Sequence, residues 1–208
     1  MGRPEAWCYI CVIMPDQNFA LFETTIGAVG IVWNARGIVA VQIPEATEAA
    51  TRKHLQNRYP AAQEAPPSAE TQKAIDGIRG LLRGEPRDLT GIVIDNENSP
   101  AFDAKVYAIA RTIPPGRTMT YGEIADRLGD KLLAREVGTA LGQNPCPIIM
   151  PCHRVLAAGG KTGGFSASGG VVTKLRLLTI EGAQPGGAHI VRQSSSRCAA
   201  LGAQPDSC

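Results

Sequence analysis

The sequence predicts a small α/β domain followed by a mainly helical domain, because the spacing of apolar residues changes along the chain. Residues 21–43 are apolar and rich in β-branched side chains, and a polar turn divides them into segments 26–33 and 37–43, which predicts a β-hairpin. Segments 46–59 and 71–83 then have helical composition. Beyond residue 100 the apolar spacing is mainly helical, which places the second domain there.

A polar, turn-forming stretch separates the two predicted domains. Before it, segment 61–69 is rich in Pro, Ala and Glu and predicts a loop, and the apolar run 90–94 predicts a short strand. We therefore assign residues 1–98 to the N-terminal domain and residues 99–183 to the C-terminal domain. Residues 184–208 are rich in Gly, Ala, Ser and Gln, and we expect them to form a mobile tail.

The C-terminal domain is expected to contain a pair of short helices joined by a turn. A helix over 101–112 is broken by a Pro-Pro-Gly sequence. Thr120 and Glu123 then form a capping-box pattern at the start of a helix over 121–128, and a third helix follows over 132–141. Such a pair resembles a helix-turn-helix, a motif that the pattern alone does not distinguish from other helical pairs.

Three further segments complete the C-terminal domain. Segment 145–151 is apolar and contains three prolines, which predicts a buried, extended chain rather than a helix. Segment 159–170 holds six glycines in twelve residues and predicts a loop. Apolar residues at helical spacing predict a last helix over 171–180.

Charge and hydropathy limit the choice of partners. The first 100 residues carry nine Lys and Arg against twelve Asp and Glu, whereas residues 101–182 carry ten against six. The second half can therefore present a surface to phosphate groups, and a solvated basic face is the alternative. We expect no membrane span, because no apolar run is long enough, and no secretory signal. The six scattered cysteines are expected to be reduced thiols in the cytoplasm.

The segment from Pro151 to Val155, PCHRV, carries the clearest chemical signal. A thiol becomes a strong nucleophile only as the thiolate, and a nearby histidine and positive charge favour that form. The apolar approach, the pair Cys152 and His153, and the glycine-rich loop after them indicate a reactive pocket. The alternative is a buried cysteine that packs as a small hydrophobic residue, and the pair alone does not exclude it.

An ordered set of motifs over about residues 101–183 resembles the O6-alkylguanine-DNA alkyltransferases, the methylated-DNA–protein-cysteine methyltransferase family. The sequence NPCPIIMPCHRV, from Asn144 to Val155, is similar to the active-site signature of that family. The resemblance extends to IPPG at 113–116, TYGE at 120–123, AREVG at 134–138, the glycine loop with Phe165, and LLTIEG at 177–182.

The resemblance implies a fold and a mechanism. The N-terminal domain would have a ribonuclease H-like α/β fold, although its own sequence matches the family poorly. The activity would be direct repair of O6-methylguanine, and of O4-methylthymine, in a single irreversible turnover. Cys152 would attack the O6-alkyl carbon, His153 would act as general base through a water, and Glu181 would orient the histidine. Tyr121 would donate a hydrogen bond to the guanine ring. Without the family, Glu181 would be a surface carboxylate and Tyr121 a packing residue.

The resemblance also implies how DNA is bound. The target carbon lies inside a stacked duplex, so the nucleotide must be flipped out. Family members place the second helix of a helix-turn-helix in the minor groove, where base readout is degenerate. Arg135 would enter the vacated space in the stack, and Thr120, Ala134 and Gly138 would contact the DNA. The acidic Glu136 is expected to point away from this surface.

The expected substrate pocket consists of Asn144, Val155, Phe165, Ser168 and Lys174. Asn144 matches an asparagine that holds the helix-turn-helix against the cysteine, and a helix C-cap is the alternative. The chain after Phe165 is two residues longer than the commonest family pattern. Either Ser166 or Ser168 could therefore supply the backbone N–H that faces O6, and we favour Ser168 because two glycines follow it directly.

We expect no cofactor, and double-stranded DNA containing O6-alkylguanine as the partner. The protein is expected to act as a monomer, with cooperative binding to DNA left open. Cys8 and Cys11 form one C-x2-C pair, which is half of a zinc site, and His54 is the only histidine near them in sequence. Zinc at this pair is the less favoured reading.

Three other functions share parts of this pattern. A non-catalytic protein that binds alkylated DNA would lack the cysteine, and Cys152 is present. A regulator that senses methyl transfer would carry an extra DNA-binding module and a second reactive cysteine in a zinc site, and the first half offers neither clearly. A cysteine hydrolase would need water to regenerate Cys152, and a thioether is not hydrolysed in that way.

Overall fold

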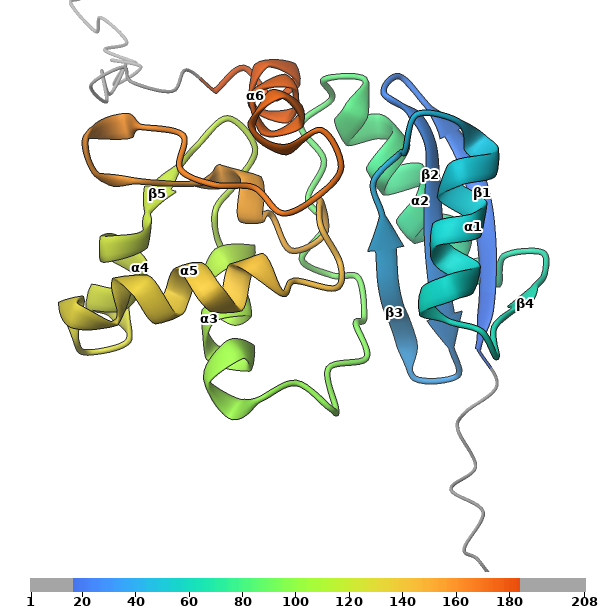
Figure 1. Cartoon of the computed structure of the whole chain (residues 1–208), viewed down its shortest axis with the longest axis horizontal. Helices are drawn as coiled ribbons and strands as arrows, with labels where there is room; N and C mark the ends of the chain where they lie inside the picture. Colours follow the sequence, from blue (N-terminus) through green and yellow to red (C-terminus); the bar gives the residue numbers. More distant parts are fainter. Residues whose placement is uncertain (1–16, 184–208) are drawn as a thin grey trace, which may run out of the picture.

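The computed structural model describes residues 17–183, and its N-terminal part is a four-stranded sheet between two helices (Figure 1). Strands β1 (Asn18–Thr24), β2 (Gly27–Asn34) and β3 (Gly37–Gln42) are antiparallel neighbours. The two-residue β4 (Gln63–Glu64) pairs in parallel with β1, so that the strand order is β3-β2-β1-β4. The predicted hairpin is confirmed as β2 and β3, and β1 begins before the predicted β segment.

The structure confirms both predicted helices of the N-terminal part. Helix α1 (Glu48–Arg58) follows Thr47, and helix α2 (Ala69–Leu82) follows Ser68. Each of these two hydroxyl side chains accepts a hydrogen bond from a backbone N–H of the first turn, which satisfies a donor that the helix itself leaves unpaired. The sequence therefore determines where both helices begin.

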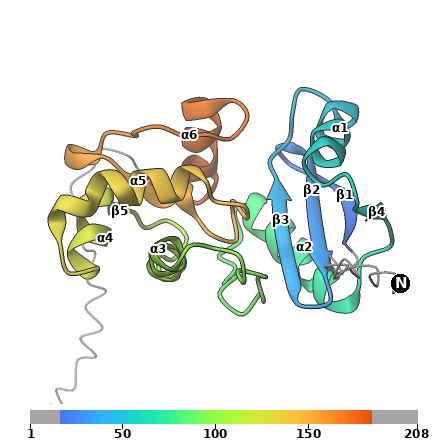
Figure 2. The same ribbon diagram turned by 60° about the horizontal axis from the view of Figure 1, so that its bottom comes forward.

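The two faces of the sheet are covered by different helices because the side chains of a strand alternate (Figures 1 and 2). In β2, Ile31 belongs to the hydrophobic cluster that contains Ile75 of α2, whereas Val32 clusters with Leu55 of α1. Gly30 allows α1 to approach closely, since a Cβ atom there would lie 2.1 Å from Cδ1 of Leu55.

The C-terminal part is mainly helical, as the sequence predicts. Its elements are α3 (Ala101–Arg111), β5 (Met119–Thr120), α4 (Tyr121–Arg127), η1 (Lys131–Leu133), α5 (Ala134–Gly142), η2 (Cys152–Arg154), β6 (Val155–Leu156), η3 (Ala158–Gly160) and α6 (Gly170–Ile180). Helices α3, α4 and α5 pack against one another, and β5 pairs in parallel with β6. No helix within residues 17–183 has the length and apolar character needed to cross a bilayer.

The predicted strand over 90–94 is wrong. Only Ile94 forms a β-bridge, to Ile38 of β3, and the preceding residues form turns. The reason is Arg111, whose Nη2 atom donates to three carbonyl oxygens of this connection, including that of Thr90 at 2.6 Å. These carbonyl groups are satisfied by a side chain instead of a neighbouring strand.

The prediction of an extended chain over 145–151 is also wrong, although the segment is buried as predicted. The N–H of Met150 donates to the carbonyl oxygen of Cys146 at 2.8 Å, which closes a turn. Ile148 has a φ of 76°, a left-handed conformation that costs a β-branched residue roughly 1–2 kcal/mol. Its side chain is 1% exposed, and burial in the core offsets this strain.

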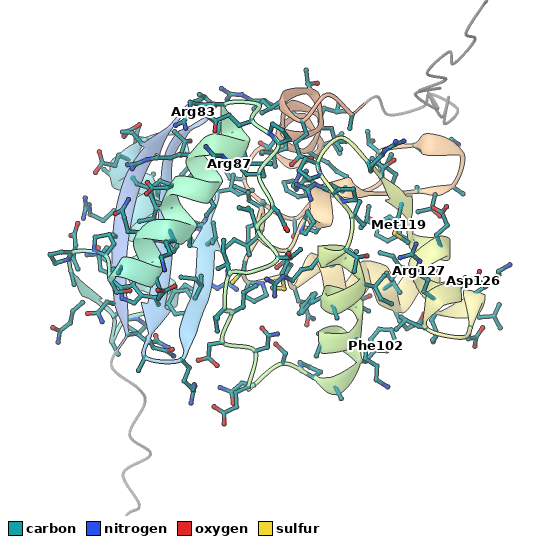
Figure 3. The ribbon with its side chains drawn as sticks, turned by 180° about the vertical axis from the view of Figure 1, so that it is seen from behind. Arg83, Arg87, Phe102, Met119, Asp126 and Arg127 are labelled. Atoms are coloured by element: carbon teal, nitrogen blue, oxygen red, sulfur yellow. The ribbon has the colours of Figure 1, made fainter. Side chains whose placement is uncertain are left out.

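One hydrophobic cluster joins the two parts of the molecule. It includes Ile75 of α2 together with Val106 of α3, Val137 of α5 and Leu177 of α6. The view from behind shows α2 with Arg83 and Arg87 beyond its end on one side, and Phe102 on α3 on the other (Figure 3). The two halves therefore share a core, and the N-terminal part can influence the position of elements in the C-terminal part.

Candidate active site

Cys152 follows the buried turn, and Asn144 holds both ends of that turn. The Oδ1 atom of Asn144 accepts a hydrogen bond from the N–H of Cys146 at 2.9 Å, and its Nδ2 atom donates to the carbonyl oxygen of Met150 at 2.7 Å. Gln143, not Asn144, is the C-cap of α5. The Asn144 side chain thus links the end of α5 to the cysteine, which is the geometry expected of a residue that holds the helix pair against the thiol.

The residue Cys152 is 9% exposed. Burial raises the pKa of Cys152, and a hydrogen bond with Asn144 and the positive charge of Lys174 act in the opposite direction. Because the net shift is upward, the resting residue is a thiol at neutral pH. A reaction at its Sγ atom therefore needs a base that removes the proton.

His153, Glu181 and Arg154 form a buried network beside the thiol. The Nε2 atom of His153 lies 2.9 Å from Oε1 of Glu181, and these side chains are 0% and 2% exposed. Arg154 donates from Nε to Oε2 and from Nη2 to Oε1 of the same carboxylate, each at 2.8 Å, and from Nη1 to the carbonyl oxygen of Ile113. Glu181 is thus buried at the end of α6, where the sequence alone suggests a surface carboxylate.

Arg154 has a role that the sequence does not predict. Its place next to Cys152 and His153 in the chain suggests a charge that favours the thiolate. In the structure its guanidinium group pairs with Glu181, 27 residues away, and no local pattern reveals this partner. The planar guanidinium group of Arg154 binds both carboxylate oxygens of Glu181 and so fixes the position of the carboxylate. The carboxylate in turn holds the histidine ring.

The network leaves His153 neutral. Burial lowers the pKa of His153 and outweighs the opposing effect of Glu181. Burial raises the pKa of Glu181, but the hydrogen bonds with His153 and Arg154 outweigh it and bring the value to about 2. A neutral imidazole that donates Nε2–H to this carboxylate carries its lone pair on Nδ1, which is buried and has no hydrogen-bond partner among the described residues. Nδ1 is therefore the basic atom of this histidine.

Lys174 and Val155 are fully buried and do not line the cavities described next. Lys174 is 0% exposed, and its Nζ atom donates to the carbonyl oxygens of Val155 at 2.6 Å and Gly164 at 3.3 Å. Burial lowers the pKa of Lys174 to about 8, and the Cys152 thiolate acts in the opposite direction. This lysine thus ties α6 to β6 and to the glycine loop, and its charge lies near the thiol.

A cavity of about 540 Å³ opens at Cys152. It is lined by residues of α4, α5 and the glycine loop: Tyr121, Ala134, Arg135, Gly138, Leu141, Gly142, Cys152, Gly164, Phe165 and Ser166. Burial, and then the charge of a Cys152 thiolate, raise the pKa of Tyr121, so its hydroxyl stays protonated and can donate a hydrogen bond. Seven residues singled out in the sequence, including Arg135 and Phe165, thus meet at one opening.

Thr120 does not line this cavity and instead caps α4. Its Oγ1 atom accepts a hydrogen bond from the N–H of Glu123 at 3.1 Å, and its own N–H donates to Oε2 of Glu123 at 2.6 Å. The predicted capping box is thus confirmed. It fixes the first turn of α4, from which the Tyr121 side chain reaches the cavity.

The two loop serines have different partners. Ser166 lines the 540 Å³ cavity, and its Oγ atom donates to the carbonyl oxygen of Gly142 at 2.8 Å. Ser168 lines a second cavity of about 190 Å³, which also includes Cys152, and its Oγ atom donates to Oε2 of Glu45 at 2.7 Å. The contact with Glu45 brings the N-terminal part to the site, and sequence reasoning missed it because the two residues are 123 positions apart.

The start of α5 is exposed beside the larger cavity. Arg135 and Glu136 are both exposed, but only Arg135 lines the cavity. Leu132, just before the helix, is 85% exposed. Ala134 and Gly138, one turn apart, present little side chain at the cavity wall. A helix with small residues can approach another molecule closely, and Arg135 is the long side chain at its edge.

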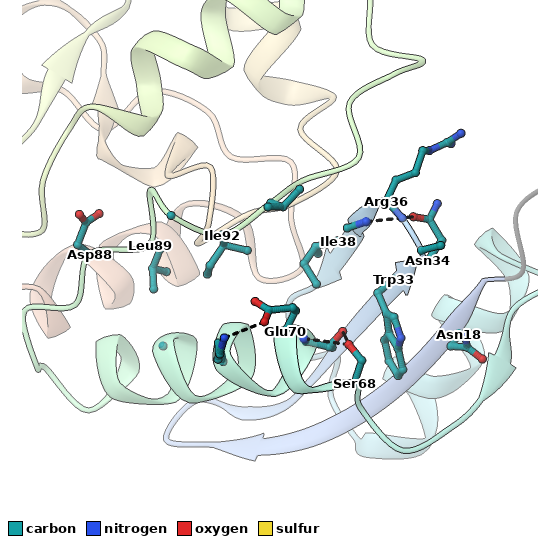
Figure 4. A pocket seen from close by; sticks show the side chains of 17 residues that line it. Asn18, Trp33, Asn34, Arg36, Ile38, Ser68, Glu70, Asp88, Leu89 and Ile92 are labelled. Atoms are coloured by element: carbon teal, nitrogen blue, oxygen red, sulfur yellow. Dashed lines mark hydrogen bonds and ion pairs between the residues drawn. The ribbon is translucent and has the colours of Figure 1, made fainter.

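Neither a further cavity nor any cluster of metal-binding side chains offers a second candidate site among the described residues. A cavity of about 790 Å³ lies between α2 and the connection to the C-terminal part, lined by Trp33, Ile38 and Leu89 among others (Figure 4). It contains none of the predicted site residues. Within residues 17–183 no group of three His, Cys, Asp or Glu side chains is arranged to hold a metal ion. Cys8 and Cys11 lie outside the described residues.

The chain matches the sequence profile of the family described as 6-O-methylguanine DNA methyltransferase, DNA binding domain, over residues 101–183. A methylated-DNA–protein-cysteine methyltransferase of Methanothermobacter thermautotrophicus is 33% identical over 154 residues, which cover 74% of this chain and 79% of the relative. The protein of that name from Mycobacterium tuberculosis is 32% identical over 165 residues, covering 79% of this chain and 92% of the relative.

Solved structures agree with these sequence matches. The crystal structure of Mycobacterium tuberculosis O6-methylguanine methyltransferase has a TM-score of 0.64 and 30% identity, covering 80% of this chain and 93% of that chain. The Mycobacterium tuberculosis protein in complex with DNA has a TM-score of 0.65 and 31% identity, covering 79% and 92%. The chain therefore belongs to the methylated-DNA–protein-cysteine methyltransferase family, whose members are DNA repair proteins.

Proposed function

We propose that this protein repairs O6-alkylguanine in double-stranded DNA by transferring the alkyl group to Sγ of Cys152. The observation that carries the proposal is a thiol at the opening of a cavity, beside a neutral histidine that a buried carboxylate holds in one orientation. The same chemistry extends to O4-methylthymine, which presents an alkylated oxygen in a similar ring position.

The transfer is an in-line displacement at the alkyl carbon. The Sγ–C bond forms as the C–O6 bond breaks, and the electron pair of that bond stays on the guanine. His153 takes the thiol proton at Nδ1, through a bridging water, while Glu181 stabilises the ring that becomes charged. The Tyr121 hydroxyl donates a hydrogen bond to the leaving base.

The product is a thioether, which water does not cleave, so each protein molecule acts once. We therefore expect the amount of alkyl group removed from a duplex to stop at one equivalent of protein. The direct measurement is the transfer of a labelled methyl group from O6-methylguanine in duplex DNA to protein. Continued turnover beyond one equivalent would contradict the proposal and would indicate a hydrolase.

We further propose how DNA reaches the site. Helices α4 and α5 act as a helix-turn-helix, with Ala134 and Gly138 of α5 in the minor groove and Arg135 in the space left by the flipped nucleotide. The position of Arg135 at the rim of the cavity supports this role. Contacts with phosphate supply most of the affinity, so binding is expected to weaken as salt increases. The protein is proposed to act as a cytoplasmic monomer without a cofactor, and the N-terminal part to have a ribonuclease H-like fold.

Arg135→Ala is expected to lower the rate of transfer from duplex DNA at least tenfold, because unstacking a paired base costs a few kcal/mol. The loss should be largest where the lesion is well paired and smallest in single-stranded DNA. Single-turnover rates on matched duplex and single-stranded substrates measure this. Arg127→Ala is the control, since Arg127 is exposed on α4 and does not line the cavity (Figure 3). Equal losses on both substrates would instead indicate that Arg135 contacts phosphate.

The pH dependence follows from the lowered pKa of His153. Nδ1 can accept a proton only while the ring is neutral, and the pKa of the ring lies below its ordinary value of 6.5. The single-turnover rate is therefore expected to be constant around neutral pH and to fall only below pH 6.5. DNA binding is measured separately at each pH. A rate that instead rises about tenfold per pH unit up to pH 9 would mean that Cys152 ionises before the reaction, without His153.

A further inference from the structure

The glycine loop that borders Cys152 is held by a residue of the N-terminal part. Ser168 donates from Oγ to Oε2 of Glu45 at 2.7 Å, and Glu45, Ser168 and Cys152 line the same 190 Å³ cavity. Phe165 and Ser166, in the same loop, line both cavities at Cys152. The position of this loop therefore sets the shape of the space in front of the thiol.

Glu45 also has contacts within the N-terminal part, in addition to its hydrogen bond with the loop. Its backbone N–H donates to Oγ1 of the buried Thr51 at 2.9 Å. Its Oε1 atom accepts a hydrogen bond from Nε2 of Gln42 at 3.3 Å and lies 3.2 Å from Nδ1 of His54. These contacts come from β3 and α1, so Glu45 is bound to two elements of the N-terminal part.

The loop is fixed on its other side by α6. Oγ1 of Thr173 donates to the carbonyl oxygen of Ser168 at 2.8 Å. Gly169 has a φ of 78°, and a Cβ atom there would lie 2.2 Å from Oγ1 of Thr173, so only glycine fits this close approach. Ser168 is thus the point at which the loop is attached both to α6 and, through Glu45, to the N-terminal part.

We propose that Glu45 is a positioning residue for alkyl transfer, which acts through Ser168 to hold the loop 165–169 in front of Cys152. The N-terminal part then does more than share a core with the C-terminal part, because it supplies one of the attachments that shape the reaction cavity. The inference rests on the proposed function, since it assigns a role in that same transfer. It predicts that the loss of Glu45 slows the transfer step while DNA binding at α5 is unaffected.

The test is the single-turnover rate of transfer from O6-methylguanine duplex DNA, measured over a range of DNA concentrations. Glu45→Ala is expected to lower the maximal rate about tenfold, the effect of losing one hydrogen bond to a charged acceptor, with an unchanged apparent affinity for DNA. Ser168→Ala should give the same loss, and the double variant should lose no more than either single variant. Glu45→Gln should recover most of the rate, because the amide oxygen can accept the hydrogen bond from Ser168.

Glu48→Ala is the matched control, because Glu48 is an exposed glutamate nearby that pairs with Arg52 and does not touch the loop. Its rate should equal that of the unmodified protein. If Glu45→Ala does not fold, the maximal rate of Ser168→Ala tests the inference by itself, because that substitution removes only one hydroxyl group. An unchanged maximal rate in these variants, or additive losses in the double variant, would overturn the role of Glu45 and leave the proposed alkyl transfer intact. An unmodified protein that transfers nothing overturns the proposed function and the inference with it.

Discussion

Replacing Cys152 with alanine is expected to abolish alkyl transfer and to leave the binding of lesion-containing DNA unchanged. The variant removes the only atom proposed to form a bond with the alkyl carbon, while the helix pair α4 and α5 stays intact. Transfer is measured with labelled O6-methylguanine duplex, and binding is measured on the same duplex. Retained transfer in Cys152→Ala would contradict the mechanism.

Cys146→Ala is the matched control for this experiment. Cys146 is the other cysteine within residues 17–183 and is fully buried. Burial raises its pKa to about 12, so it stays a thiol and does not react. The variant is expected to transfer normally and to lose about 1 kcal/mol of stability from the small cavity that it creates. Loss of transfer in Cys146→Ala but not in Cys152→Ala would reverse the assignment.

Replacing Arg154 with alanine is expected to lower the free energy of unfolding by about 3–5 kcal/mol, because it leaves the Glu181 carboxylate buried with one partner instead of two. Chemical denaturation measures the change. Arg52→Ala is the control: Arg52 pairs with Glu48 and Glu64 on the surface, and such pairs contribute at most about 1 kcal/mol. Equal effects of the two substitutions would show that the buried network does not stabilise the fold.

The same Arg154→Ala variant is expected to change the pH dependence of transfer. Without the guanidinium group, the charge of Glu181 acts on His153 alone and raises the pKa of the imidazole. The acid limb of the rate profile should then move to higher pH than in the unmodified protein. An unmoved limb in a folded variant would mean that His153 does not accept the proton.

Short-range signals in the sequence predict most of the secondary structure. The capping box of Thr120 and Glu123 depends on residues within one turn, and the structure confirms it. The helices predicted over 46–59 and 71–83 are also confirmed, and their starts lie at the caps Thr47 and Ser68, within about three residues of the predicted ones. The strand predicted over 90–94 fails because Arg111, far along the chain, binds the carbonyl groups that a strand would pair. The turn before Cys152 depends on the burial of Ile148 in a strained conformation, which no local preference favours.

In the candidate site, too, local sequence signals do not predict contacts between distant segments. The motif around Cys152 points to the proposed nucleophile and its neighbouring histidine, and the family pattern points to Glu181. The second partner of that carboxylate, Arg154, and the contact from Glu45 to Ser168 are set by packing between distant segments. Adjacency in the chain even suggests the wrong partner for Arg154, because its side chain pairs with Glu181 instead of the thiol.

The most direct test of the central claim is intact-protein mass spectrometry after mixing the protein with a duplex that contains one O6-methylguanine. We predict a mass gain equal to one methylene group on the whole protein population, which peptide mapping places on Cys152. An unchanged protein mass despite tight binding to the lesion would contradict the account and would indicate a non-catalytic protein that binds alkylated DNA.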